Sequence, residues 1–270
     1  MFSPQYERVV VTGAGSGIGR AVALALAEAG CTVFALGRTH SKIEATARAL
    51  PSGAGRLTPV SCDVRNQAQV EATFDAVERD GGPAQALYHA AADSYRALLE
   101  HITLEGFKSV LESRAVGSFN MLQRWARPLL ARGLPGAAVL VTSALGSREA
   151  PGMAHSSLAC AGVNSLMRAA AREWGRFNLR VNVIAPGAFP TAAIEEISAS
   201  AVGQRMLRAA ALGRFGDLEE IVGPSVFLLS RAASYVTGEI LAVDGGLKLQ
   251  PWTLLEPGDP GYSQEIAERQ

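Results

Sequence analysis

Eight residues near the N-terminus form the first pattern that could perform chemistry. The segment from Thr12 to Gly19 carries four glycines and directly follows a β-branched run that ends at Val11. Glycines in such a turn let the backbone approach a pyrophosphate, and the unpaired N–H groups of the helix that follows attract its charge. The pattern therefore predicts a dinucleotide site formed by Gly13, Gly15, Ser16, Gly17, Ile18 and Gly19.

The end of the second predicted strand determines which dinucleotide is preferred. That strand ends at Leu36 and is followed by Gly37 and Arg38. An acidic residue at this point would accept hydrogen bonds from the ribose 2′-hydroxyl of NAD, whereas an arginine pairs with the 2′-phosphate of NADP. Because the chain has Arg38 and no carboxylate here, we expect NADP(H) as the cofactor. The alternative is that Arg38 only faces solvent.

A cofactor site of this kind requires a scaffold in which strands and helices alternate. Short β-branched runs do alternate with helical patterns along the chain, among them a long helix at 152–177, and this alternation predicts a parallel sheet. We expect an α/β fold with one Rossmann-type, doubly wound domain over residues 1–250 and a C-terminal tail at 251–270. Seven strands are predicted, at Arg8–Val11, Thr32–Leu36, Leu57–Cys62, Ala86–Ala90, Ala137–Thr142, Arg180–Ile184 and Glu239–Val243.

Composition limits the classes of partner. The 270 residues include 25 basic and 25 acidic side chains, so the chain lacks the positive charge that non-specific nucleic-acid binding uses. The longest apolar stretch, at 21–29, is far shorter than a bilayer span. Three widely spaced cysteines predict neither a disulfide framework nor a zinc site. We expect a cytoplasmic protein that acts on a small molecule, without a nucleic-acid, membrane or metal partner.

Motifs along nearly the whole chain resemble the classical short-chain dehydrogenase/reductase family. The turn at 12–19 is similar to its TGxxxGIG motif, and the run at 62–64 is similar to its adenine contact. Gly238 and the run at 244–246 match its last strand and turn. The resemblance implies a homotetramer or a dimer, and a substrate-covering segment at 191–212. It also implies cofactor contacts from Asp63, Val64, Ala90, Pro186, Gly187 and Thr191.

The same resemblance exposes a degenerate catalytic site. Enzymes of the family carry Asn, Ser, Tyr and Lys, and their positions fall here on Arg114, Ser143, Ser156 and Cys160, of which only Ser143 is retained. In the family the Tyr donates a proton to the substrate carbonyl and the Lys lowers the pKa of that Tyr. A serine hydroxyl is a far weaker acid than a phenol, and a neutral thiol supplies no positive charge. Ordinary ketone reduction is therefore not expected.

Hydride addition to a conjugated double bond does not require a strong acid at the substrate oxygen, because hydrogen-bond donors can stabilise the resulting enolate. The chain has a closer resemblance to the 2,4-dienoyl-CoA reductase group, carried by the runs at 142–148, 180–182 and 233–238. That group also lacks the usual Tyr but keeps a Lys where this chain has Cys160. We therefore expect an NADP(H)-dependent reductase of a conjugated or activated small molecule. A non-redox lyase, isomerase or cyclase, and a pseudoenzyme on the same fold, stay open as alternatives.

Several side chains could replace the missing proton relay. His155 precedes the long helix and His89 ends a strand where doubly wound sheets bind ligands, so each is an acid–base candidate or a structural histidine. Arg114 either anchors a carboxylate or enolate or pairs with Glu112. Cys160 is either a reactive thiol or a small apolar filler. The catalytic candidates are Ser143, Ser156, His155, Cys160, Arg114 and His89, with Tyr95 as a secondary phenol.

Overall fold

Alternating valines build the centre of the sheet. In the computed structural model, Val9 and Val11 of β1 (Arg8–Thr12) face one apolar cluster and Val10 faces the other, since successive strand residues point to opposite faces. All three are fully buried, as expected for a parallel strand covered on both sides. The structure describes residues 3–144, 151–191 and 200–249.

The described residues form one parallel sheet of seven strands, as predicted. Its order is β3-β2-β1-β4-β5-β6-β7, so the chain runs outward from β1 in one direction and then returns to continue from β4 in the other. Ligands bind at such a reversal, beyond the carboxyl ends of the strands. Each predicted strand is confirmed to within a residue or two: β1, β2 (Thr32–Gly37), β3 (Arg56–Ser61), β4 (Ala86–His89), β5 (Gly136–Val141), β6 (Leu179–Pro186) and β7 (Ile240–Val243).

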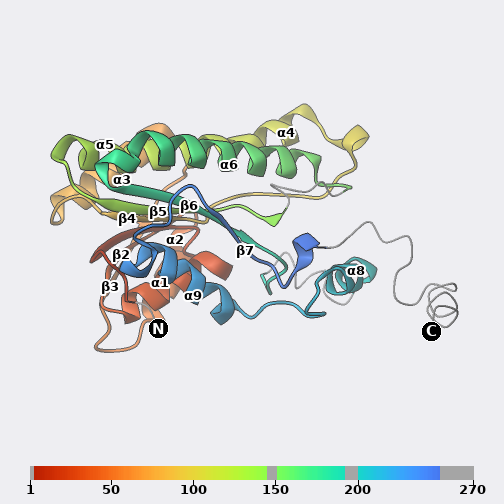
Figure 1. Cartoon of the computed structure of the whole chain (residues 1–270), viewed down its shortest axis with the longest axis horizontal. Helices are drawn as coiled ribbons and strands as arrows, with labels where there is room; N and C mark the ends of the chain where they lie inside the picture. Colours follow the sequence, from red (N-terminus) through yellow and green to blue (C-terminus); the bar gives the residue numbers. More distant parts are fainter. Residues whose placement is uncertain (1–2, 145–150, 192–199, 250–270) are drawn as a thin grey trace, which may run out of the picture.

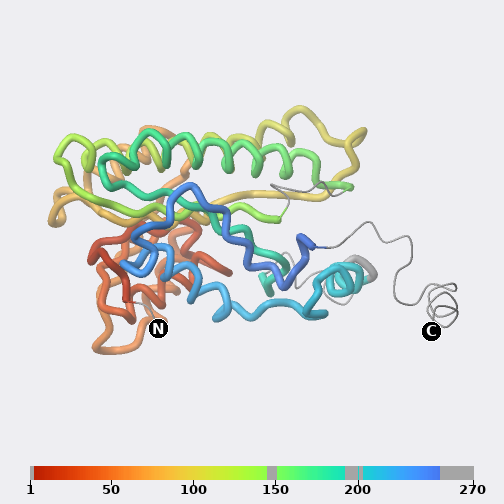
Figure 2. The backbone as a smooth tube through the Cα atoms, in the orientation of Figure 1, coloured from red at the N-terminus to blue at the C-terminus, as the bar shows by residue number. Residues whose placement is uncertain are grey.

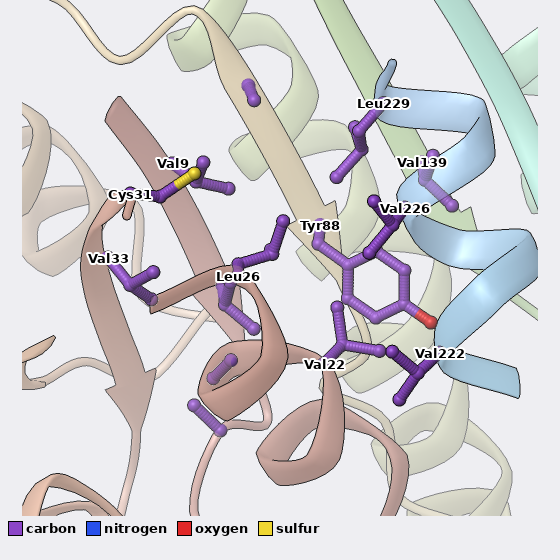
Figure 3. Close-up of a cluster of buried hydrophobic side chains, with 14 of the residues drawn as sticks. Val9, Val22, Leu26, Cys31, Val33, Tyr88, Val139, Val222, Val226 and Leu229 are labelled. Carbon is purple, nitrogen blue, oxygen red and sulfur yellow. The ribbon is translucent and has the colours of Figure 1, made fainter. Parts of the chain in front are cut away.

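Helices cover both faces of this sheet (Figure 1). One face carries α1 (Gly17–Glu28), α2 (His40–Arg48) and α9 (Leu218–Leu229), and the other carries α3 (Gln67–Arg79), α5 (Gly117–Arg132) and α6 (Ala154–Trp174). In Figure 3, valines and leucines of α1 and α9 lie around the ring of a buried tyrosine of β4; these side chains are Val22, Leu26, Val222, Val226 and Leu229, and the tyrosine is Tyr88.

Two long helical segments cover the sheet on the side of α3, α5 and α6. The helix predicted at 152–177 is α6 followed by a 3₁₀ turn at Gly175–Phe177. A second long helical segment consists of α4 (Leu104–Leu111), a π turn (Glu112–Val116) and α5. The π turn takes in one residue more than an α turn, and such turns are frequent at functional sites. A further helix, α8 (Ala201–Ala209), extends away from the sheet (Figure 1).

The N-terminal segment packs against the end of α9. The N–H of Gln5 donates to the carbonyl of Leu229 over 3.2 Å, and Pro4 pairs with Ser230 in an isolated bridge. Figure 2 shows the red N-terminal backbone beside the blue trace of α9. The predicted tail at 251–270, part of the segment at 191–212 and the last residues of the motif at 142–148 lie outside the described residues.

The described residues contain no helix that could span a membrane, no cluster of metal ligands and no disulfide. No helix in the described part of the chain is long and apolar enough to cross a membrane. Within residues 3–144, 151–191 and 200–249, no group of three or more His, Cys, Asp or Glu side chains could hold a metal ion. The three cysteines, Cys31, Cys62 and Cys160, are buried and free.

Candidate active site

The glycine turn occupies the carboxyl end of β1 and the start of α1. Gly13 has φ +67°, in the left-handed region that favours glycine, and a Cβ there would lie 3.0 Å from the backbone of Ala90. A Cβ on Gly19 would collide with the carbonyl of Gly13. Since α1 begins at Gly17, the free N–H groups of its first turn lie next to these glycines. The turn has the close-packed backbone that a pyrophosphate site requires.

A cleft of about 580 Å³ starts at this turn and crosses the reversal point of the sheet. Gly187 is the one predicted cofactor residue that does not line it. A Cβ on Gly187 would lie 2.6 Å from Cα of Asp244, so this glycine allows two loops to approach each other instead. The predicted residues that line the cleft are Gly13, Gly15, Ser16, Gly17, Ile18, Gly19, Arg38, Asp63, Val64, Ala90, Pro186 and Thr191.

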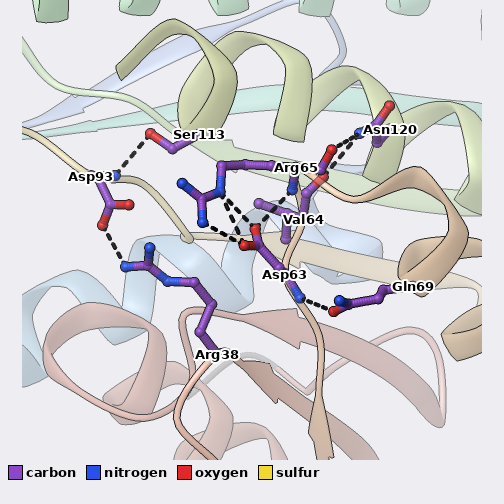
Figure 4. Close-up of polar contacts among 8 residues, drawn as sticks. All are labelled: Arg38, Asp63, Val64, Arg65, Gln69, Asp93, Ser113 and Asn120. Carbon is purple, nitrogen blue, oxygen red and sulfur yellow. Dashed lines mark hydrogen bonds and ion pairs between the residues drawn. The ribbon is translucent and has the colours of Figure 1, made fainter. Parts of the chain in front are cut away.

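Arg38 lies in the cleft wall with an acidic partner. Its Nη2 is 2.8 Å from the carboxylate of Asp93, which belongs to the loop after β4 (Figure 4). The backbone N–H of Asp93 donates in turn to Oγ of Ser113 in the π turn. Sequence reasoning missed Asp93 because it lies 55 residues from Arg38. A phosphate at Arg38 would compete with this carboxylate.

Asp63, at the end of β3, is held by a neighbouring arginine. Arg65 donates to both carboxylate oxygens, with 2.6 Å between Nη2 and Oδ2, and so holds the pKa of Asp63 below its usual range. The backbone N–H of Asp63 donates to the side chain of Gln69 (Figure 4). The next residue, Val64, packs on α5, because a Cβ added to Gly117 would lie 2.7 Å from Cγ2 of Val64. The loop after β3 is therefore fixed between α3 and α5.

Three of the predicted catalytic candidates meet beside the cleft. Nη1 of Arg114 is 3.5 Å from Sγ of Cys160, and that sulfur is 3.6 Å from Oγ of Ser143. These side chains come from the π turn, α6 and the residues that follow β5, which are far apart in the sequence. Arg114 lines the cleft, as does Thr142, the neighbour of Ser143. The geometry thus brings one cation, one hydroxyl and one thiol together.

Ser156 lies apart from that group, fully buried in the first turn of α6. Its Oγ is 2.5 Å from Oγ of Ser94, and Ser94 lines the cleft. The hydroxyl at the position of the family's Tyr therefore contacts the cleft only through a second hydroxyl. Sequence reasoning missed Ser94, because no local pattern in the loop after β4 shows that it folds onto α6.

His155 and Tyr95 form a tilted ring pair. Their ring centroids are 4.3 Å apart, and His155 is fully buried, with no hydrogen-bond partner for either ring nitrogen among the residues that the structure describes. The phenol of Tyr95 packs against Gly106 of α4, because a Cβ added to this glycine would lie 2.9 Å from Cζ of Tyr95. Neither ring lines the cleft described above. The pair joins the loop after β4 to the start of α6.

His89 is buried at the carboxyl end of β4. Its Nδ1 is 2.9 Å from Oγ1 of Thr12, and its Nε2 has no hydrogen-bond partner in the described part of the chain. Burial, aided by the positive charge of Arg114, lowers the pKa of His89 to about 4. The imidazole is therefore neutral at neutral pH and holds no imidazolium proton to donate.

Comparisons with known proteins agree with this architecture. The profile of a family described as enoyl-(acyl carrier protein) reductase matches residues 13–248. A peroxisomal 2,4-dienoyl-CoA reductase of Mus musculus is 31% identical over 239 residues, which cover 87% of this chain and 82% of the relative. The structure of a short-chain type dehydrogenase/reductase from Mycobacterium ulcerans is 30% identical with a TM-score of 0.86, and the match covers 92% of each chain. A gluconate 5-dehydrogenase from Burkholderia cenocepacia, crystallised with NADP and tartrate, is 30% identical with a TM-score of 0.85 over 91% of this chain and 96% of that one.

Proposed function

This chain belongs to the short-chain dehydrogenase/reductase family of oxidoreductases, and we propose that it is an NADP(H)-dependent reductase of a conjugated small molecule. The observation that carries the proposal is the composition of one cleft. Its glycine turn and Arg38 suit a nicotinamide dinucleotide. In its other part Arg114 lines the cleft and contacts Cys160, which contacts Ser143, and no Tyr–Lys pair is present at Ser156 and Cys160.

The residues of the cleft fit NADP(H). The turn excludes side chains at Gly13 and Gly19, which is the condition for close contact between backbone and pyrophosphate. Arg38 uses one hydrogen bond on Asp93, so further guanidinium donors are left for a 2′-phosphate. A bound nicotinamide would supply the hydride.

Ser143 is suited to hold the substrate oxygen. Its hydroxyl can donate a hydrogen bond to a carbonyl conjugated with the double bond, and the bond strengthens as negative charge develops on that oxygen. In the overall reaction the double bond gains a hydride at the β-carbon and a proton from water at the α-carbon, while NADPH is oxidised to NADP⁺. No strong protein acid is required.

Reduction of an unactivated ketone is not expected from this site. An alkoxide product would need a proton from an acid in contact with the substrate. Ser156 is buried on Ser94, Cys160 has no positive charge, and His89 is neutral. None of these groups reproduces the Tyr–Lys relay.

Isotope transfer tests the proposed function. The protein is incubated with NADPH deuterated at nicotinamide C4 and with a panel of enones and dienoyl thioesters, and the products are analysed by mass spectrometry. Deuterium on a carbon of the product, matched by NADPH consumption, is expected. Complete conversion without deuterium transfer or NADPH consumption would overturn the reductase proposal and favour a lyase, isomerase or cyclase.

Exposed apolar side chains support assembly into a homotetramer or dimer. Large apolar residues on and beside α4, α5 and α6 are each more than two-fifths exposed, and burial of these side chains between subunits would remove apolar surface from water. Light scattering after size exclusion tests the assembly, with an acidic substitution of Phe119 expected to weaken it. The residues are Leu104, Val116, Phe119, Leu158 and Phe177.

A further inference from the structure

Arg114 carries a positive charge that no acidic group of the described residues neutralises. Its guanidinium lines the cleft, and its Nε is buried without a hydrogen-bond partner within residues 3–144, 151–191 and 200–249. Its contact with Cys160 is to a thiol, which is a weak acceptor. The alternative pairing with Glu112 is not formed in the part of the chain that the structure describes.

Three other arginines of this protein, which line the cleft or are buried, do have carboxylate partners. In the same cleft, Arg38 contacts Asp93 and Arg65 contacts Asp63. Away from the cleft, the buried Arg124 is surrounded by three carboxylates of α3. Removing a cation from water costs free energy unless an anion and hydrogen bonds compensate. Among the described arginines that line the cleft, Arg114 alone lacks such compensation.

The backbone around Arg114 is held in place. Before Arg114, Oγ of Ser113 in the π turn accepts a hydrogen bond from the backbone N–H of Asp93. After it, Gly117 packs closely against Val64 in the loop after β3. A cation fixed in this way is preorganised for a ligand that approaches through the cleft. His89 is neutral at neutral pH and adds no second positive charge.

We propose that Arg114 binds a carboxylate of the substrate, so that the preferred substrates are conjugated oxo acids and not neutral enones. A guanidinium binds a carboxylate through two parallel hydrogen bonds. Ser143 contacts the same sulfur as Arg114, so a molecule with a carboxylate at Arg114 can place a second oxygen near Ser143. Only the reaction in this inference rests on the proposed function; the anion site itself rests on the geometry of Arg114.

A pair of inert probes tests the anion site without turnover. Levulinate and its amide, levulinamide, share a keto group and a carbon skeleton but differ in charge, and neither has a double bond to reduce. Their binding to the whole protein is measured by isothermal titration up to millimolar concentrations, with and without saturating NADP⁺. We expect levulinate to bind about 10- to 100-fold more tightly than the amide, the effect of one charge-assisted hydrogen-bond pair.

Substitutions locate the effect. Arg114→Gln is expected to abolish the preference for levulinate, and Arg114→Lys, which keeps the charge but not the fork, is expected to retain part of it. Arg79→Gln, an exposed arginine at the end of α3, is the matched control and should bind both probes as the unmodified protein does. Thermal unfolding supplies a second measure, because removing an uncompensated cation should leave Tm unchanged or raise it.

The outcomes separate this inference from the proposed function. Equal affinity for the two probes, or no binding of levulinate at millimolar concentration, would overturn the carboxylate site even if deuterium transfer is observed with neutral enones. A large fall in Tm for Arg114→Gln with an unchanged probe preference would show a structural arginine. A levulinate preference that depends on Arg114 would uphold the site even if no hydride transfer is ever found.

Discussion

Oγ1 of Thr12 lies 2.9 Å from Nδ1 of His89 and also accepts the N–H groups of Ala90 and Ala91. Because that oxygen already accepts two hydrogen bonds, its own proton goes to Nδ1, and the neutral His89 carries its hydrogen on Nε2. The threonine at the end of β1 thereby fixes the first residues of the loop after β4. The same loop carries Asp93, which contacts Arg38, and Ser94, which contacts Ser156.

His89 should make the stability of the protein depend on pH. Its pKa is about 4 in the folded protein against 6.5 as the ordinary value, so the unfolded chain binds a proton at a higher pH than the folded chain. The free energy of unfolding should therefore fall as the pH decreases from about 6.5 to about 4, by on the order of 3 kcal/mol. Urea unfolding at a series of pH values should give a flatter dependence for His89→Asn. Parallel curves for the two proteins would contradict this assignment.

Arg38 should determine the preference between the two nicotinamide cofactors. Its guanidinium supplies charge-assisted hydrogen bonds to a 2′-phosphate, which NADH lacks. Isothermal titration should show NADPH binding more tightly than NADH, and Arg38→Ala should weaken NADPH binding about 10- to 100-fold while NADH binding is unchanged. Equal affinities in the unmodified protein would show that this arginine does not select the cofactor.

Asp93 should oppose NADPH binding. Its carboxylate occupies Arg38 and would repel a phosphate placed beside it. Asp93→Asn is therefore expected to raise the affinity for NADPH by a few-fold, in line with the small energy of an exposed ion pair, and to leave the affinity for NADH unchanged. A loss of affinity for both cofactors would instead show that Asp93 matters for the fold of its loop.

Ser143 should act on the rate of the chemical step. If its hydroxyl stabilises negative charge on the substrate oxygen, Ser143→Ala should lower kcat by about 10² to 10³. KM should change much less, because the hydrogen bond strengthens only as charge develops. Rapid-quench measurement of deuterium transfer separates this effect from product release. An unchanged kcat would remove Ser143 from the mechanism.

Tyr88 should contribute to stability and not to activity. Its hydroxyl is 2.9 Å from Oγ of Ser225, which itself donates to the carbonyl of Ile221, and both side chains are fully buried. The ring of Tyr88 extends from β4 toward α9 (Figure 3). Tyr88→Phe should lower the free energy of unfolding by about 1 kcal/mol, the usual net value of one hydrogen bond. The exposed Tyr235→Phe is the matched control and should have no measurable effect.

The fold and the glycine turn that begins the cleft follow from local signals in the sequence. Each strand, the glycine spacing at 12–19 and the position of an arginine directly after β2 can be recognised within a short window of residues. The contacts made by the loop after β4 cannot. Ser94 and Ser156 are 62 residues apart, and Arg38 and Asp93 are 55 apart, so their meeting depends on how one loop folds. The apolar pattern also continues through 112–116 and does not distinguish a π turn from an α-helix.

The π turn at Glu112–Val116 contains one residue that an uninterrupted α-helix from α4 to α5 would not need. The loss of one codon inside the turn can therefore be absorbed by its conversion to an α turn, which leaves Met121 and Trp125 in the core. The loss of one codon within α4, by contrast, would rotate the residues that follow by about 100° and carry both side chains out of the core. Conversion of the turn would instead change the position of Arg114. The contact between this arginine and Cys160 thus depends on the residue count of the turn as well as on the side chain.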